Sequence, residues 1–319
     1  MQLLSKTASY LQGRGRYGEA ELLYQQGFRI WEQQVGPEHP DTIAALGKLT
    51  RLYKVQGKFA EAELLYQRIL RIEEQAHRDI SFLLTDLAIL YRDQGKFAEA
   101  EPLNQRILRI QEQQWGSGHS LVALALISLA NLYRDQGKFA EAEPLYQRAF
   151  HILEQQEPEY PLIALPLGNL ADFYRGQGKL AEAESLYRRA FHAMEHLAVP
   201  DHLLVAYPLN NLADFYRDQG KLAEAESLYL RALRIREQQV GPEHPETAET
   251  MYHFGLLREA QSNSEEARFL YASALAIREQ AFGRYHPQTM ETRKRLIALL
   301  LTMGQHEEAA KLEETPSEP

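Results

Sequence analysis

The chain has 319 residues, of which 45% are apolar, and its 35 basic and 44 acidic side chains give a net charge of −9. An acidic balance of this size argues against general binding of nucleic acid or of an anionic membrane. The absence of cysteine excludes disulfides and thiolate metal sites. The N-terminus lacks the pattern of a signal peptide, and no run of about 18 apolar residues could span a membrane. We therefore predict a soluble, cytoplasmic protein.

One segment recurs along the chain. Residues 132–150 read LYRDQGKFAEAEPLYQRAF, and residues 90–108 differ from them at three of 19 positions. Residues 215–233, FYRDQGKLAEAESLYLRAL, are a third copy. Self-similarity of this length predicts a stacked array of repeats rather than separate globular domains.

A glycine near the middle of each repeat fixes the register. The positions are Gly15, Gly57, Gly95, Gly137, Gly178, Gly220, Ser262 (in place of glycine) and Gly304. The intervals between them are 42, 38, 42, 41, 42, 42 and 42 residues. This spacing predicts one array over residues 1–312 and a disordered tail at 313–319. The eight repeats are expected at about 1–40, 41–78, 79–120, 121–161, 162–203, 204–245, 246–287 and 288–312.

Each repeat is predicted to form two helices around its glycine. With this glycine numbered 15 in every repeat, apolar residues of the fourth repeat fall at positions 4, 7, 8 and 11, as Leu126, Leu129, Ala130 and Tyr133. This is the spacing of one helix face. A second stripe follows at positions 20 to 31, and glycine at the turn can adopt the left-handed conformation cheaply. With no strand-like alternation, the fold class is all-α.

The connectors between repeats have their own signature. They read VGPEHPDT at 35–42, VGPEHPET at 240–247 and FGRYHPQT at 282–289. Glycine and proline end one helix, and we expect Asp41 or Thr42 to cap the next. His39, His244 and His286, with His119 in a variant connector, each lie in a different repeat, so a shared metal site is not expected. The shorter opening of the third repeat, and Pro158 and Pro161 in the fifth, predict local bends.

The two ends of the array differ. Met1 begins directly inside the first predicted helix, which suggests either a fragment of a longer protein or a surface for self-association, and hence a homo-oligomer. The last repeat has a polar second helix, HEEAAKLEE, which is typical of a terminal cap.

The pattern of a small residue at 8, Tyr at 11, Gly at 15, Ala at 20, Tyr at 24 and Ala at 27 resembles the tetratricopeptide repeat (TPR). The 42-residue period and the GPEHP connector resemble the kinesin light chain type of that repeat. The resemblance implies a right-handed superhelical α-solenoid whose first helices line a concave, peptide-binding groove. The sequence departs from the pattern at Arg258 and Ser262, at Ile297 and Leu300, and at Asn104.

Polar residues occupy the helix face opposite the first apolar stripe, at positions 6, 9 and 12. This is the side that lines the groove in the family. The candidate groove residues are Lys48, Arg51, Lys54, Arg92, Asn131, Arg134, Asn169, Asp172, Arg175, Asn211, Asp214 and Arg217. The cluster of Lys48, Arg51 and Lys54 predicts a groove that is more positive toward its N-terminal end.

Each candidate also has a structural interpretation. The arginines at position 12 can pair with the aspartate at position 13 or with glutamates of the AEAE segment. Asn169 and Asn211 resemble groove asparagines that hold a ligand backbone, but they can equally bridge adjacent repeats. Both interpretations stay open at the level of sequence.

The sequence contains no catalytic constellation: no phosphate loop, HExxH motif or Ser/His/Asp arrangement is present. We therefore expect no enzymatic activity, cofactor or metal. The predicted function is a protein-interaction scaffold that binds a peptide or protein partner, with an acidic segment of the partner across repeats 2 to 4. The alternative is a sensor or self-association segment of a larger signalling protein, such as a bacterial signalling ATPase.

Overall fold

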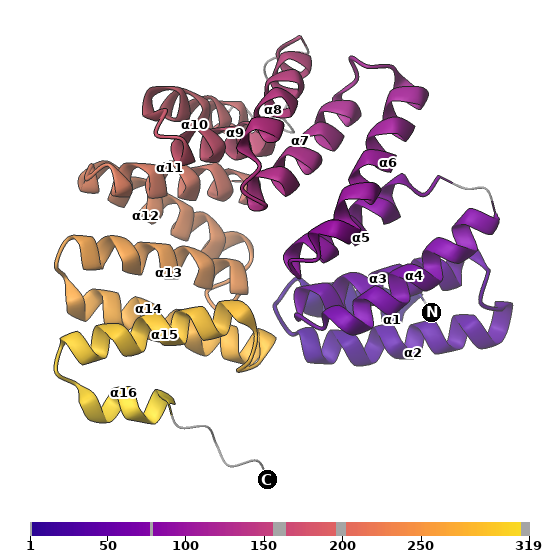
Figure 1. Ribbon diagram of the computed structural model, residues 1–319. Helices are drawn as coiled ribbons and strands as arrows, with labels where there is room; N and C mark the ends of the chain where they lie inside the picture. Colours follow the sequence, from indigo (N-terminus) through magenta and orange to yellow (C-terminus); the bar gives the residue numbers. More distant parts are fainter. Residues whose placement is uncertain (1, 77–78, 156–163, 196–201, 314–319) are drawn as a thin grey trace. The chain divides into compact units, whose positions relative to one another are not determined.

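The apolar stripes fold into pairs of antiparallel helices in the computed structural model of the chain (Figure 1). The structure describes residues 2–76, 79–155, 164–195 and 202–313. Within these ranges it contains sixteen α-helices, one short 3-10 helix and no strand. The expected all-α fold of helix pairs is confirmed.

The first helix of each pair is called here the A helix and the second the B helix. The A helices are α1 (Gln2–Gln12), α3 (Pro40–Val55), α5 (Ser81–Asp93), α7 (Ser120–Asp135), α9 (Ala164–Gly176), α11 (Ala206–Asp218), α13 (Pro245–Ala260) and α15 (Pro287–Thr302). The B helices are α2 (Tyr17–Val35), α4 (Phe59–Gln75), α6 (Phe97–Trp115), α8 (Phe139–Glu154), α10 (Leu180–Glu195), α12 (Leu222–Gln239), α14 (Ser264–Phe282) and α16 (His306–Glu313). The 3-10 helix η2 (Leu203–Val205) precedes α11.

The helices fall into two compact units, which are described separately. Unit 1 consists of residues 1–23, 55–57 and 201–319, and unit 2 of residues 24–54 and 58–200. The predicted repeat boundaries stay a prediction. The expected disordered tail and the bend at Pro158 and Pro161 lie outside the described residues, except that α16 continues through Glu313.

The core of each repeat is built where a small residue on the A helix meets a small residue on the B helix. In the fourth repeat Ala130 of α7 and Ala142 of α8 have no exposed surface. A buried tyrosine at position 24 of the B helix packs beside this contact; its copies are Tyr66, Tyr146, Tyr187, Tyr229 and Tyr271. Close packing of this kind accounts for the fixed residue sizes at positions 8, 20 and 24.

The turn between the A and B helices requires the left-handed conformation that glycine provides. Gly137 has φ of 74°, and the equivalent glycines have similar values. Ser262 adopts the same conformation, with φ of 60°, although its side chain makes this conformation unfavourable. The turn geometry therefore does not change where the repeat loses its glycine.

Recurrent polar residues join neighbouring repeats within unit 2. The Tyr91 hydroxyl and Lys96 Nζ both reach the carboxylate of Glu63 in the preceding B helix, at 3.2 and 2.7 Å. Tyr133 repeats the arrangement with Glu101, at 2.9 Å. A second tie joins neighbouring B helices, as between Arg106 and Glu74, at 2.8 Å. The QGK and AEAE motifs are thus explained by contacts between repeats.

The seventh repeat replaces these contacts with others. Arg258 stands at the position of the tyrosine, and its Nη2 lies 2.9 Å from Glu226 of the preceding B helix. Asn263 stands at the position of the lysine and instead caps α14 by accepting the backbone N–H of Glu266 at 3.3 Å. The Gln261 amide donates to the other carboxylate oxygen of Glu226 at 2.9 Å, so an arginine and a glutamine here occupy the acceptor that a tyrosine and a lysine share elsewhere.

Histidines cap the A helices that follow the connectors. The expectation that Asp41 or Thr42 would be the cap was wrong. His39 Nδ1 accepts the backbone N–H of Asp41 at 3.2 Å. The Thr42 hydroxyl donates instead to the carbonyl oxygen of Gly36 at 2.7 Å, which closes the connector on itself. Threonine is therefore a connector residue here and the imidazole is the cap.

Candidate functional site

The predicted groove residues lie on one side of the A helices, here called the A-helix polar face. Three of them fall on α3, one on α5, two on α7 and three on α9, all in unit 2. The other three lie on α11 of unit 1. Within each helix they are three residues apart, which places them on one face. The side chains divide into three groups by their contacts.

The first group, at position 9, accepts hydrogen bonds from the buried tyrosines. The Tyr146 hydroxyl donates to Asn131 Oδ1 at 2.5 Å, and the Tyr229 hydroxyl donates to Asp214 Oδ1 at 2.6 Å. Tyr187 makes the same bond to Asp172. Position 9 therefore holds the acceptor that a buried hydroxyl needs.

The third repeat supports this assignment by lacking both partners. Position 9 is Ile89, which has no acceptor, and position 24 is Asn104 in place of tyrosine. The Asn104 amide donates to the carbonyl of Ala100 on its own helix at 3.2 Å. Acceptor and donor are lost together in this repeat. Where the tyrosine is kept but position 9 is Leu256, the Tyr271 hydroxyl donates instead to Glu259 at 2.5 Å.

The second group consists of cations that alternate with aspartates along unit 2, here called the charge ladder. Lys54 Nζ lies 3.9 Å from Asp93, and Arg92 contacts both Asp93, at 3.2 Å, and Asp135 of the next A helix, at 3.6 Å. Arg134 closes the row on Asp135 at 2.9 Å. Burial lowers the pKa of Lys54. These cations therefore have carboxylate partners, as the structural interpretation proposed.

The remaining cations of this face differ from the ladder. Arg51 is exposed, and its guanidinium lies over the Phe82 ring at 5.6 Å from the centroid. Among the described residues it forms no ion pair. Lys48 is half-buried, and Arg175 is followed by Gly176 where the third, fourth and sixth repeats have an aspartate. Arg51 is thus the cation of this face most available to an external carboxylate.

The third group consists of the asparagines at position 6. Asn169 on α9 and Asn211 on α11 are both half-buried. Within the described part of the chain neither amide hydrogen-bonds to another residue, so the bridge between repeats that the sequence allowed is not formed there. Each amide keeps its donors and its acceptor for other contacts.

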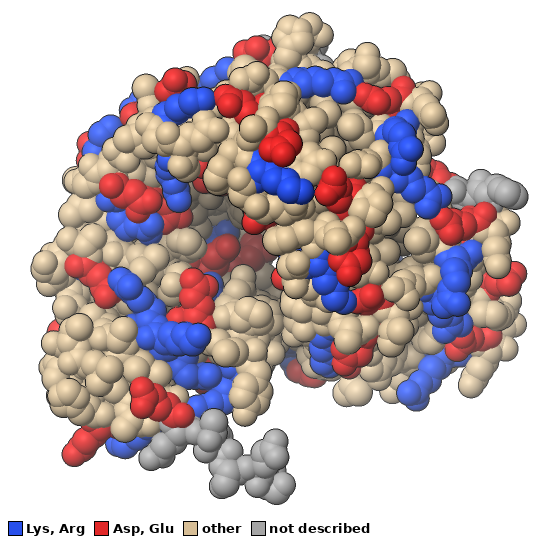
Figure 2. All heavy atoms as spheres, in the orientation of Figure 1, with Lys and Arg blue, Asp and Glu red and all other residues tan. Residues whose placement is uncertain are grey.

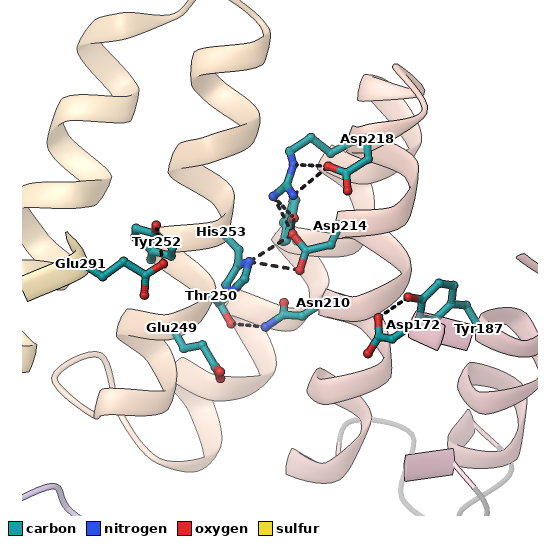
Figure 3. A network of polar contacts seen from close by, with 12 residues as sticks. Asp172, Tyr187, Asn210, Asp214, Asp218, Glu249, Thr250, Tyr252, His253 and Glu291 are labelled. Carbon is teal, nitrogen blue, oxygen red and sulfur yellow. Dashed lines mark hydrogen bonds and ion pairs between the residues drawn. The ribbon is translucent and has the colours of Figure 1, made fainter. Parts of the chain in front are cut away.

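In unit 1, Asp214 is the centre of a polar network (Figure 3). Besides Tyr229, it binds Arg217 Nη1 at 2.5 Å and His253 Nδ1 at 3.0 Å. Burial alone would raise the pKa of this carboxyl, but the hydrogen bond and charge of His253, together with Arg217, hold the pKa below its usual value. Arg217 also reaches Asp218 at 2.9 Å. Asp214 is therefore an internal counterion.

His253 was not identified from the sequence. It stands at position 6 of the seventh repeat, in line with Asn169 and Asn211, and position 6 of the eighth repeat is Arg295. The periodicity could have identified both residues if the row had been extended past the point where Ser262 replaces glycine.

Two buried arginines were also missed. Arg236 is 2% exposed, and its Nη1 donates to the Thr250 hydroxyl at 2.9 Å. Arg278, 3% exposed, repeats this bond to Thr292 at 2.6 Å. Arginine at position 31 and threonine at position 3 of the next repeat occur together at these two junctions and nowhere else in the sequence. Their pairing across repeats is the signal that could have found them.

Charge is finely mixed on the surface. On the face drawn in Figure 2, lysines and arginines are interspersed with aspartates and glutamates. Among the described residues, no group of three His, Asp or Glu could hold a metal ion. No helix in the described ranges is long and apolar enough to cross a membrane.

Stacked helix pairs with a small-residue contact, a glycine turn and a buried tyrosine define an α-solenoid of helix-turn-helix repeats. The tetratricopeptide repeat model matches residues 1–75, 79–155, 122–196, 162–238 and 204–280, and the chain belongs to this family. No curated protein sequence matches it.

Solved structures show the same fold. A putative kinesin light chain of Podosopora anserina with nearly identical TPR-like repeats is 24% identical, with a TM-score of 0.52, and the match covers 63% of this chain and 96% of that one. The quorum sensor NprR of B. thuringiensis, in its apo form, is 13% identical, with a TM-score of 0.61, covering 98% and 84%. A Rap protein complexed with competence and sporulation factor is 14% identical, with a TM-score of 0.55, covering 96% and 98%.

Proposed function

We propose that the chain is a non-enzymatic scaffold that binds a peptide or protein partner on its A-helix polar face. An acidic segment of the partner would lie across α3, α5 and α7, against Lys48, Arg51, Lys54, Arg92 and Arg134. The observation that carries this placement is the exposed Arg51 guanidinium, which forms no direct ion pair among the described residues, although its charge acts on the carboxyl of Asp86. A guanidinium binds carboxylates in a planar, bidentate manner.

Two further features support binding on this face. The ring of Phe82, next to Arg51, is 61% exposed and offers apolar contact area. The amide of Asn169, in the same unit as α3, α5 and α7, could bind a peptide backbone through both a donor and an acceptor. The similar fold of the Rap protein, whose structure contains competence and sporulation factor, supports a peptide or protein as the class of partner.

The test reverses the charge of two residues on this face and, as a control, of two residues on the B helices. A partner captured from the source lysate is titrated against the wild type and against Lys48→Glu/Arg51→Glu. We expect at least about tenfold weaker binding, equivalent to about 1.4 kcal/mol, and a flatter dependence on salt. The control, Arg71→Glu/Arg109→Glu, makes the same change in net charge on the B helices α4 and α6. Unchanged affinity of the first variant would contradict the placement, and equal weakening of both would indicate a nonspecific charge effect.

Self-association through the N-terminal end is the alternative proposal, alone or within a larger signalling protein. Light scattering at several concentrations, on the same sample as the capture experiment, separates the two. A monomer that retains a specific partner supports the scaffold. A stable oligomer that captures no partner supports assembly and directs mutagenesis to α1.

A further inference from the structure

We infer that the connector histidines make the array pH-sensitive, because each caps a helix only while its imidazole is neutral. The same geometry occurs at five connectors. In each, Nδ1 accepts the backbone N–H two residues further along, at 3.2 or 3.3 Å; the residues are His39, His119, His202, His244 and His286. Four of these caps begin A helices and the fifth begins η2, directly before α11.

The chemistry of the ring makes this cap conditional. A neutral imidazole can leave Nδ1 unprotonated as an acceptor, whereas an imidazolium carries protons on both nitrogens and can only donate. Protonation therefore sets an N–H against the backbone N–H and removes the cap. It also places positive charge at the N-terminus of a helix, where the helix dipole is already positive.

Histidine is an unusual choice for this position. Serine, threonine, aspartate and asparagine are the preferred caps, and none of these four side chains titrates near neutral pH. In the shortened connector the equivalent hydrogen bond is made by Asp79, which accepts the backbone N–H of Ser81 at 2.9 Å and so caps the start of α5. A cap that does not titrate near neutral pH is therefore compatible with this fold. Only the histidines make the cap depend on protonation near neutral pH.

The groups that face each imidazole set its response. His39 lies beside Trp31, and its Nδ1 is 3.6 Å from Asp41, whose carboxylate would accept a hydrogen bond from the protonated ring in a replacement ion pair. His119 stacks on Trp115 at 4.9 Å, and no charged group contacts it among the described residues. His119 is therefore the cleanest single cap to follow.

The two caps near the C-terminal end are protected. Burial, with the charges of Arg236 and Arg14, lowers the pKa of His244 to about 4. Burial and Arg278 also lower the pKa of His286, whose ring stacks on Phe282 and hydrogen-bonds the backbone of Val55. The caps of α13 and α15 should therefore persist to lower pH than the ordinary pKa of histidine would allow.

The test compares three proteins at two pH values. One variant replaces His39, His119 and His202 with asparagine, which caps at any pH, and the other replaces them with alanine, which does not cap. We expect wild-type unfolding midpoints to match the asparagine variant at pH 7.5 and to approach the alanine variant at pH 5. The relative fall should be about 5 °C or more. A wild type that follows the asparagine variant at both pH values would overturn the inference.

A measurement on the wild type alone does not depend on how the variants fold. Nitrogen NMR of the imidazole of His119 should show a proton on Nε2 and none on Nδ1 at pH 7.5. The backbone amide of Leu121 should then shift with the same midpoint as the ring of His119. A ring protonated on Nδ1 at pH 7.5, or an amide that does not follow the ring, would equally overturn the inference.

Discussion

Tyr229 on α12 donates its hydroxyl to Asp214 on α11 over 2.6 Å, within the same helix pair. The bond joins residues fifteen apart, and the same spacing links Tyr187 to Asp172 and Tyr146 to Asn131. A residue predicted to face a ligand is thus hydrogen-bonded to a buried tyrosine of its own repeat. Removing its charge should affect stability before it affects binding.

The first prediction concerns Asp214→Asn. The side chain of Asp214 is 15% exposed and that of Asp218, also bound to Arg217, is 40% exposed. We expect Asp214→Asn to lower the free energy of unfolding by about 3 kcal/mol, because it breaks a buried charge network. The matched Asp218→Asn should cost less than about 1 kcal/mol. Denaturant unfolding at pH 7 measures both, and equal losses would contradict the role of Asp214.

This difference should depend on pH. The pKa of Asp214 is lowered in the folded protein, so its contribution is present above the unfolded carboxyl pKa of about 3.9. The contribution is lost as pH falls through the lower folded pKa. The difference in the free energy of unfolding between wild type and Asp214→Asn should therefore become smaller below about pH 4.

The second prediction concerns Ser262→Gly. Ser262 holds a φ of 60°, a conformation in which a side chain costs roughly 1 kcal/mol. We expect glycine there to raise the free energy of unfolding by about that amount. The reverse change, Gly137→Ser at φ of 74°, should lower it similarly. Chemical denaturation of both variants would show opposite signs, and a shared sign would count against conformational strain at this turn.

The third prediction compares two glycines inside A helices. A Cβ at Gly255 of α13 would lie 2.5 Å from Cε1 of Tyr271, whereas one at Gly47 of α3 would have no neighbour within 4 Å. Gly255→Ala should destabilise by about 1–3 kcal/mol through overpacking. Gly47→Ala should stabilise by about 0.5–1 kcal/mol, because alanine favours the helix. Thermal melts of the pair check this, and stabilisation of both would show that Tyr271 can move aside.

The fourth prediction concerns the pH dependence that His244 contributes. Its pKa is about 4 in the folded protein and about 6.5 in an unfolded chain, so folding favours the neutral ring. The stabilisation is complete above about pH 6.5 and is lost as pH falls toward 4, to a total on the order of 3 kcal/mol. Unfolding free energies of wild type and His244→Asn between pH 7.5 and 4 should show a shallower slope in the variant. Parallel curves would contradict this prediction.

The period and residue sizes were enough to predict the helix pairs, since a small residue at position 8 or a glycine at position 15 has one local explanation. Contacts between repeats were harder to predict. Arg258 looked like a departure from the pattern, yet it binds Glu226 at 2.9 Å in place of a tyrosine and a lysine. A single sequence does not reveal that Arg258 donates to an acceptor 32 residues earlier in the chain.

The site was predicted less well for a related reason. Regular repetition of Arg92 and Arg134 fitted both a ligand row and an internal ion-pair row, and only the positions of Asp93 and Asp135 distinguish them. The connector histidines recurred as clearly as any residue. Their role as caps depends on ring orientation, which spacing does not specify.

The charge ladder has a consequence for selectivity. Asp93 and Asp135 already form ion pairs with the cations that an acidic partner would approach. They therefore compete with the carboxylates of that partner. An incoming carboxylate would exchange one ion pair for another and gain little from the exchange alone. Discrimination between partners would then fall to groups that no internal carboxylate imitates, such as Arg51 with the ring of Phe82. Along the charge ladder a ligand would therefore be selected by its shape and backbone, and its acidic groups would contribute to selectivity mainly at Arg51.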